Sequence, residues 1–199
     1  MRVLWCDTET TGIKPEDSGA FEIGFLYKTG NDTRKVWDRL FYLNPIDEEK
    51  GILFHEDAAK IHGYSREQIE SFPEAKVMLP KITEFLNDYC HDFKESGSFE
   101  KLYFAGYNSN FDWEHLDALM SRYTKYRMTD FFETKQLDVY AQVKRASETG
   151  VINTINHKLG PICKSLNVNL ENAHDALADI KATRDLAILL QRKGVNLIL

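Results

Sequence analysis

The stretch VLWCDTETTG, residues 3–12, is the part of the chain from which the fold is best understood. Its apolar beginning is typical of a buried β-strand, in which alternate side chains point to the same face. Asp7 and Glu9 therefore share a face, and at roughly 3.3 Å of rise per residue they are attached about 7 Å apart. Two buried acids without a basic neighbour repel each other and favour protonation. A divalent cation would relieve that repulsion, although an Asp-x-Glu pair also occurs in solvated turns and helix caps.

Length and composition predict one packed domain. The chain has 199 residues, of which 43% are hydrophobic and 12% aromatic, and this is sufficient for a single core. We therefore expect one domain over residues 1–199. Residue 1 leads directly into the first predicted strand and no apolar run approaches the length of a membrane span, so we expect a cytoplasmic protein that does not bind membranes.

Cysteine usage and charge exclude some classes of site. Cys6, Cys90 and Cys163 are widely spaced and odd in number, which predicts buried free thiols rather than disulfides or a zinc site. The formal net charge of -6 disfavours non-specific attraction to a polyanion. If the substrate is a nucleic acid, we expect metal ions and local basic clusters to attract it.

The hydrophobic pattern predicts a mixed α/β fold. Residues 20–28 and 34–43 are rich in aromatic and β-branched residues and flank Gly30-Asn31-Asp32, which is a hairpin signal. The predicted strands are 3–12, 20–28, 34–43, 102–106 and 135–140. The predicted helices are two short ones within 53–71 and longer ones at 74–93, 111–123, 157–166 and 172–193, with 141–154 as a polar loop. This order suits a five-stranded mixed sheet flanked by helices on both faces.

Two later segments add acids and a histidine. Asp112 follows the 102–106 strand at the start of a helix, where α/β sheets place their chemistry, although an acid there is equally a cap. His174 and Asp179 open the last predicted helix, for which Asn172 is the predicted cap. Five helical residues amount to about 7.5 Å of rise and 140° of rotation. The two side chains therefore reach one site only if His174 lies in the first turn or in the loop before it; otherwise they are a surface histidine beside a solvated acid.

Together these segments resemble the DEDDh exonucleases, the DnaQ-like family of 3′→5′ exonucleases. The resemblance spans nearly the whole chain in the family's order and approximate spacing. Its motifs are Asp7-x-Glu9-Thr10-Thr11-Gly12, Asn108-x-x-Phe111-Asp112 and His174-Asp175-Ala176-x-x-Asp179, with Ile61-His62-Gly63 similar to a further family segment that lies near the substrate. Tyr107 departs from the family, since many relatives have histidine there. Asp138 resembles another acid common near the site, and it is equally a cap for the helix that follows.

The resemblance implies a ribonuclease H-like fold and a two-metal mechanism. Two Mg²⁺ or Mn²⁺ ions would be held by Asp7, Glu9, Asp112 and Asp179, since oxygen ligands suit these ions better than zinc. Such a pair of ions clamps the attacking and leaving oxygens of an in-line phosphoryl displacement. His174 would be the general base, because an unperturbed imidazole has a pKa of about 6.5. The implied reaction is hydrolysis of phosphodiester bonds at the 3′ ends of single-stranded DNA or RNA.

The resemblance also implies a pocket for the terminal nucleotide. The predicted substrate-binding residues are Thr10, Thr11, Gly12, Ile61, His62, Tyr107, Asn108 and Phe111. Aromatic rings there would stack on bases without regard to sequence, although each ring also suits a core. Four basic residues could follow the phosphates or form a solvated face: Lys158, Lys164, Lys181 and Arg184.

Two other functions stay open from the residues alone. One is a non-catalytic nucleic-acid-binding adaptor, and the other is a proofreading subunit that associates with a polymerase. A homodimer is also compatible with the family. Discrimination between DNA and RNA depends on contacts to the 2′-hydroxyl and is not readable from these motifs.

Overall fold

Strand β1 (Val3–Thr10) lies at the centre of a five-stranded sheet in the order β3-β2-β1-β4-β5. The computed structural model describes residues 2–28, 36–91, 100–171 and 173–196. Strand β2 pairs antiparallel with β1 and β3, whereas β4 pairs parallel with β1 and β5. The other strands are β2 (Ala20–Lys28), β3 (Val36–Tyr42), β4 (Leu102–Gly106) and β5 (Phe132–Asp138). The predicted mixed sheet is therefore confirmed, while the predicted turn at 30–32 lies outside the described residues.

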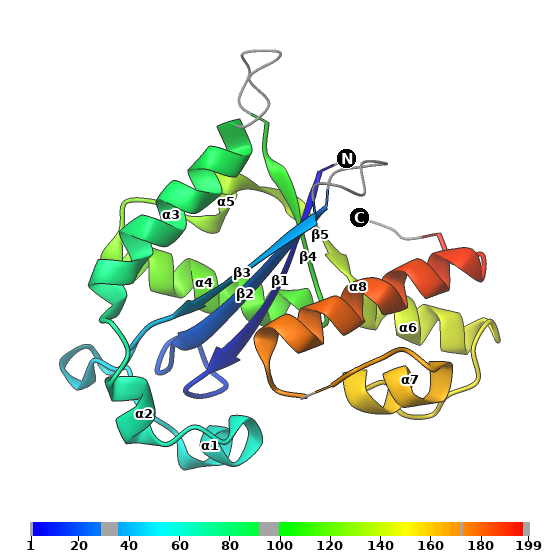
Figure 1. The fold of residues 1–199 in the computed structure, drawn as a ribbon, viewed down its shortest axis with the longest axis horizontal. Coiled ribbons are helices and arrows are strands. Elements are labelled where there is room, and N and C mark those ends of the chain that lie inside the picture. The colour runs from blue at the N-terminus through cyan, green and yellow to red at the C-terminus, as the bar shows by residue number, and fades with distance from the viewer. Residues whose placement is uncertain (1, 29–35, 92–99, 172, 197–199) are drawn as a thin grey trace.

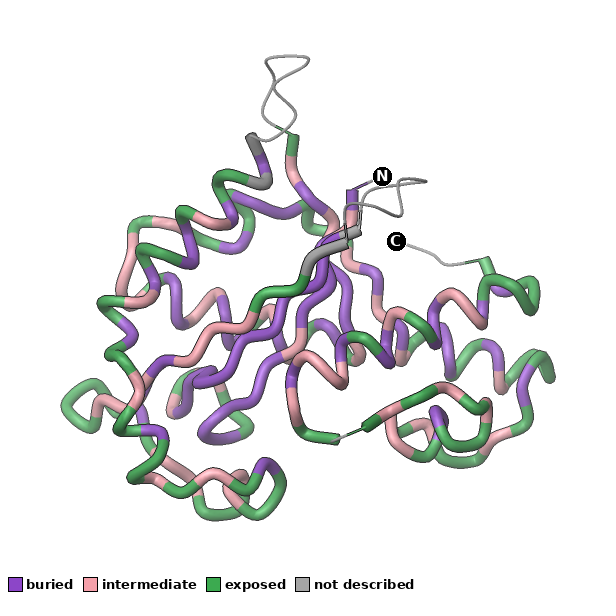
Figure 2. The backbone as a smooth tube through the Cα atoms, in the orientation of Figure 1, coloured by how far each residue is buried: buried purple, intermediate pink, exposed green. Residues whose placement is uncertain are grey.

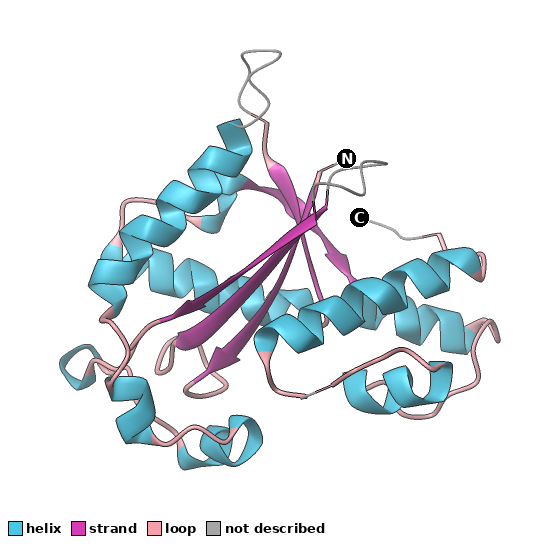
Figure 3. Ribbon diagram, viewed as in Figure 1, coloured by secondary structure: helices cyan, strands magenta, loops and turns pink. Residues whose placement is uncertain are grey.

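Helices cover both faces of the sheet (Figures 1 and 3). One layer contains α3 (Ala75–His91), α4 (Ser109–Tyr123) and α5 (Met128–Phe131). The opposite layer contains α6 (Val139–Glu148), α7 (Leu159–Leu166) and α8 (Ala176–Arg192). The short elements η1 (Glu48–Lys50), α1 (Glu56–His62) and α2 (Arg66–Glu70) connect β3 to α3. Among the described residues, none of these helices has the length and apolar character needed to cross a membrane.

The alternation of side chains along the strands divides the interior into two apolar cores. Figure 2 shows that buried residues predominate along the central strands. Leu4 and Phe104 belong to the core under α3 and α4, whereas Trp5 and Ala105 belong to the core under α6 and α8. This is the period of two expected for buried strands. Asp7 and Glu9 lie two and four residues after Trp5, so their side chains point to the same side of the sheet, toward α8.

Helix α6 corrects the prediction that 141–154 is a polar loop, and it confirms the alternative in which Asp138 caps a helix. The helix begins after Asp138, whose carboxylate accepts a hydrogen bond from the N–H of Tyr140 at 3.0 Å. Val139, Val143 and Ala146 recur at helical spacing and are buried. The polar residues between them obscured this short apolar stripe.

The last helix also begins later than predicted. Ala176 is its first residue, and Asp175 caps it by accepting a hydrogen bond from the N–H of Ala178 at 2.9 Å. His174 lies before the helix in a left-handed conformation, with φ of 71°. Asn172, the predicted cap, is outside the described residues.

Smaller shifts affect other boundaries. Strand β5 begins and ends earlier than the predicted strand at 135–140, α4 begins two residues earlier than predicted, and α7 begins two residues later. The predicted stop at Gly63 is confirmed, because this residue ends α1 with φ of 79°. The three cysteines are buried and free, as expected.

Truncation of the core beneath α4 should destabilise the fold strongly. Phe104 is 0% exposed and packs edge-on against Trp113 and Phe132. We expect Phe104→Ala to lower the free energy of unfolding by about 3–5 kcal/mol, measured by urea denaturation. Ile155 is 100% exposed, so the control Ile155→Ala should change it by less than about 0.5 kcal/mol. Equal effects of the two substitutions would contradict this description of the core.

Candidate active site

The end of β1 brings acids from two elements together. Thr8 points to the face opposite Asp7 and Glu9, toward α4, and it donates two hydrogen bonds to Oδ1 of Asp112. The backbone N–H lies 2.9 Å and the hydroxyl 2.8 Å from that oxygen. Asp112 is buried in the first turn of α4. Thr8 therefore fixes Asp112 against the same strand that carries Asp7 and Glu9.

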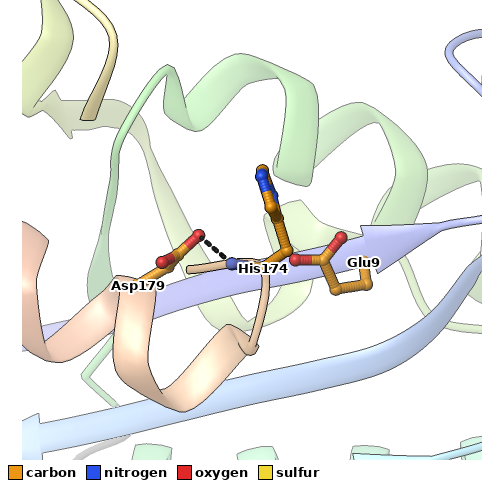
Figure 4. Close-up of side chains that lie close together, drawn as sticks. All are labelled: Glu9, His174 and Asp179. Carbon is orange, nitrogen blue, oxygen red and sulfur yellow. Dashed lines mark hydrogen bonds between the residues drawn. The ribbon is translucent and has the colours of Figure 1, made fainter. Parts of the chain in front are cut away.

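The segment before α8 brings a histidine and a further acid to Glu9. One potential ligand atom from each of Glu9, His174 and Asp179 lies within 4.8 Å of the other two. Figure 4 shows the two carboxylates on either side of His174. The backbone N–H of His174 donates to Oδ2 of Asp179 at 3.3 Å. His174 precedes the helix, so the rotation of about 100° per helical residue does not turn its side chain away from Asp179.

The electrostatics of this cluster favour a cation. Burial raises the pKa of Asp7 well above its usual value, and the charges of Asp112, Asp179 and Glu9 raise it further. Burial likewise raises the pKa of Glu9 to about 9, and it raises the pKa values of Asp112 and Asp179. No lysine or arginine in the described ranges forms an ion pair with these four acids. Several carboxylates without a cationic partner are a suitable donor set for a hard divalent ion.

A pocket of about 470 Å³ opens beside Glu9. Its walls come from the end of β1, the loop that follows it, α1 and the start of α4. They are formed by Thr8, Glu9, Thr10, Gly12, Ile13, Lys14, Asp17, His55, Asp57, Ala58, Ile61, His62 and Phe111. Ile61 is 58% exposed, and the ring of Phe111 lies 4.3 Å from that of His115 between centroids. Five of the predicted substrate-binding residues, Thr10, Gly12, Ile61, His62 and Phe111, thus line one pocket next to the acids.

The other three predicted substrate-binding residues do not line this pocket, and each forms a hydrogen bond with a neighbouring loop or with Asp138. Thr11 is buried, and its hydroxyl accepts a hydrogen bond from the N–H of Gly19 at 3.1 Å. The hydroxyl of Tyr107 donates to the carbonyl of His157. Asn108 precedes α4 in a left-handed conformation, and its N–H donates to Oδ1 of Asp138 at 2.9 Å. Asp138 therefore supports both α6 and the loop before α4.

Two of the predicted phosphate contacts are engaged in surface ion pairs. Nζ of Lys181 lies 2.6 Å from Asp38, and Arg184 lies 2.6 Å from Asp185. Lys158 precedes α7 and Lys164 lies within its last turn. The first pair joins α8 to β3, and the second joins two adjacent residues of α8.

Glu22 is the residue that sequence reasoning missed. It lies opposite Glu9 in the β1–β2 pairing, is buried, and accepts a hydrogen bond from the N–H of Ala176 at 2.9 Å. Burial raises its pKa, and its charge contributes to the raised pKa of Glu9. An acid within the otherwise apolar stretch AFEIGFLY was the available signal, because a buried carboxylate needs a partner.

Most of the chain is similar to proteins of one known family. A family model described as exonuclease matches residues 4–187. A search of curated proteins found no match. Among solved structures, the zinc-bound complex of E. coli exonuclease I with single-stranded DNA has a TM-score of 0.77 at 21% identity, covering 98% of this chain and 41% of that chain. A product-bound exonuclease I has a TM-score of 0.74 at 19% identity, covering 97% and 44%.

The structural likeness shows the fold of the protein, and the family model shows its family. At such low identity, the likeness to exonuclease I shows a shared ribonuclease H-like fold, and this chain spans less than half of the length of those proteins. The family model, in contrast, covers most of the chain. The protein therefore belongs to the exonuclease family, as the resemblance of its motifs predicted.

Proposed function

We propose that the protein is a metal-dependent 3′→5′ exonuclease of the DEDDh type that acts on single-stranded nucleic acid. The observation that carries this proposal is the approach of Glu9 on β1, Asp179 on α8 and His174 to one another, beside a pocket of suitable size for a nucleotide. Asp7 and Asp112 lie at the same end of β1, where Thr8 binds Asp112 and the charge of Asp112 raises the pKa of Asp7. The presence of every expected acid favours catalysis over a non-catalytic adaptor. Residues 1–199 would act as one exonuclease domain, and a second copy or a polymerase as partner stays an expectation from the resemblance.

The acids would hold two Mg²⁺ or Mn²⁺ ions. Asp7, Glu9, Asp112 and Asp179 supply roughly four negative charges, which two divalent ions would balance. Bound ions of this kind stabilise the charge that develops on the attacking and leaving oxygens during phosphodiester hydrolysis. The protein's own part is to hold these carboxylates at one end of β1, with Asp112 fastened by Thr8.

His174 would accept the proton of the attacking water. A neutral imidazole can do so near neutral pH, provided that the ring lies next to the reacting phosphate. Its ring also lies close enough to Glu9 and Asp179 to be a metal ligand instead. The two roles differ in what happens to metal binding when the side chain is removed.

The pocket beside Glu9 would bind the terminal nucleotide. Phe111 and Ile61 provide apolar surface for a base, and Lys14 provides a positive charge. Stacking on such surfaces tolerates every base, which suits stepwise removal of nucleotides regardless of sequence. Because exonuclease I was solved in complex with single-stranded DNA, single-stranded DNA is the first substrate to examine.

Incubation with end-labelled strands tests this function directly. With Mg²⁺ or Mn²⁺, we expect a 5′-labelled single strand to shorten stepwise, and we expect a chelator to stop the reaction because the acids then lack their cations. Parallel DNA and RNA strands of the same sequence report the sugar preference. Release of the 5′-terminal nucleotide first would contradict the proposed polarity, and hydrolysis that continues in chelator would contradict metal dependence.

Substitution of the acid and the histidine separates their roles. Asp7→Asn should abolish both Mn²⁺ binding and hydrolysis, because it removes a charged ligand. His174→Ala should keep Mn²⁺ binding and lower kcat by roughly 10²- to 10⁴-fold, the usual contribution of a general base. Calorimetry reports binding, and the strand assay reports kcat.

Asp185→Asn is the matched control, since Asp185 is exposed on α8 and pairs with Arg184. It should behave as the unsubstituted protein does. Loss of Mn²⁺ binding in His174→Ala would instead identify His174 as a ligand, and a fully active Asp7→Asn protein would remove the metal mechanism.

The stability of the metal-free protein should fall as pH rises. Burial raises the pKa of Glu9 to about 9, whereas an unfolded glutamate has a pKa of about 4.3. Between these values the folded state binds more protons than the unfolded state, so the free energy of unfolding decreases with increasing pH. We expect urea denaturation at about pH 5, 7 and 9 to show this decrease in chelator, and saturating Mg²⁺ to reduce it. A metal-free stability that increases over this range would refute the account of the acid cluster.

A further inference from the structure

Glu22 and Gly24 form the surface of β2 on which the first turn of α8 rests. Resting on the proposed function, we propose that Glu22 is a positioning residue: it fixes Ala176, and thereby holds His174 and Asp179 against Glu9. It would act through the helix start rather than by touching the substrate. No role for this glutamate follows from the motifs that the sequence shares with the family.

The contact between Glu22 and Ala176 is specific. Glu22 is 1% exposed, and its Oε1 accepts a hydrogen bond from the N–H of Ala176 at 2.9 Å. Ala176 is the first residue of α8, where a backbone N–H has no partner within the helix. The capping carboxylate of Asp175 is engaged with Ala178 instead. Glu22 therefore satisfies a buried donor that the helix's own cap does not.

Gly24 makes a close approach possible at the same place. Residues 22 and 24 share one face of β2, because alternate residues of a strand do. A Cβ atom at position 24 would lie 3.0 Å from both the carbonyl carbon and the carbonyl oxygen of Ala176. The helix start is thus held by a hydrogen bond at one residue and by direct backbone contact at the other.

The other side of the Glu22 carboxylate is also supported. Tyr64 interacts with the Glu22 carboxylate and lowers its pKa, which partly offsets the effect of burial, and it also interacts with Tyr42. Tyr42 is the cross-strand partner of Glu22 on β3. Tyr42 and Tyr64 thus lie beside the carboxylate that accepts the hydrogen bond from the N–H of Ala176.

Ala176 lies between the two functional residues in sequence. His174 precedes it by two positions and Asp179 follows it by three, and the ligand atoms of both approach Glu9. A displacement of the helix start would move both residues relative to Glu9 on β1. Glu22 and Gly24 do not line the described pocket, so such a displacement should affect turnover more than substrate binding.

Three variants test the proposal. Glu22→Gln keeps an oxygen acceptor for Ala176, Glu22→Ala removes it, and Gly24→Ala crowds the backbone of Ala176. Glu133→Ala, at an exposed position of β5, is the control. The readouts are kcat and KM on single-stranded DNA, together with residue-resolved amide exchange at Ala176 in the full chain without metal or substrate.

We expect Glu22→Ala and Gly24→Ala to lower kcat by roughly 10- to 100-fold through misplacement of catalytic groups, with KM close to that of the unsubstituted protein. Glu22→Gln should recover most of kcat. Exchange at Ala176 should accelerate roughly 10-fold or more in Glu22→Ala, since a hydrogen bond to a charged acceptor is lost, and should remain slow in Glu22→Gln.

The outcomes distinguish this inference from the proposed function. If Glu22→Gln is as impaired as Glu22→Ala, the negative charge matters rather than the hydrogen bond, and the positioning role is overturned. Unchanged exchange at Ala176 in Glu22→Ala overturns it as well. If the unsubstituted protein hydrolyses no strand, the proposed function fails, while amide exchange still decides whether Glu22 fixes the start of α8.

Discussion

Repulsion among carboxylates at the end of β1 is the force that the rest of the structure must overcome. Asp7, Glu9, Asp112 and Asp179 lie around one end of the central strand, and burial raises the pKa of each acid. The charges of Asp112 and Asp179 raise the pKa values of Asp7 and Glu9 further. A fold selected only for stability would not gather them, because buried charges of one sign cost free energy. The sheet and both helical layers hold this unfavourable arrangement in place, which is characteristic of a site built for a charged ligand.

Local pattern was sufficient to predict most of the sheet. The strands of the central sheet are apolar or aromatic runs bounded by turn residues, and their order along the chain is compatible with few topologies. The extent of helix α6 was missed because its stripe of Val139, Val143 and Ala146 is interrupted by glutamine, lysine and arginine. The start of α8 was misplaced because Asn172 and Asp175 are both good caps by residue type, and only tertiary contacts with β2 select Asp175.

The candidate site was predictable where a motif carried it. The acids and His174 were predicted from spacing and resemblance, and the structure brings ligand atoms of Glu9, His174 and Asp179 within 4.8 Å of one another. Glu22 was not found, because its importance arises from a contact across 154 positions of sequence to a backbone N–H. Tyr107 and Asn108 were predicted to contact the substrate, and this stays a prediction. In the structure the Tyr107 hydroxyl donates to the carbonyl of His157, and the backbone N–H of Asn108 donates to Asp138.

The alternation of β1 limits how this chain can vary in length. The side chain of Thr8 points toward α4, whereas those of Asp7 and Glu9 point toward α8. A single inserted residue between Trp5 and Asp7 would exchange the two faces, turning the paired acids toward α4 and the threonine toward α8. Loops can therefore gain or lose residues, but the number of positions from Trp5 to each acid of β1 must stay even.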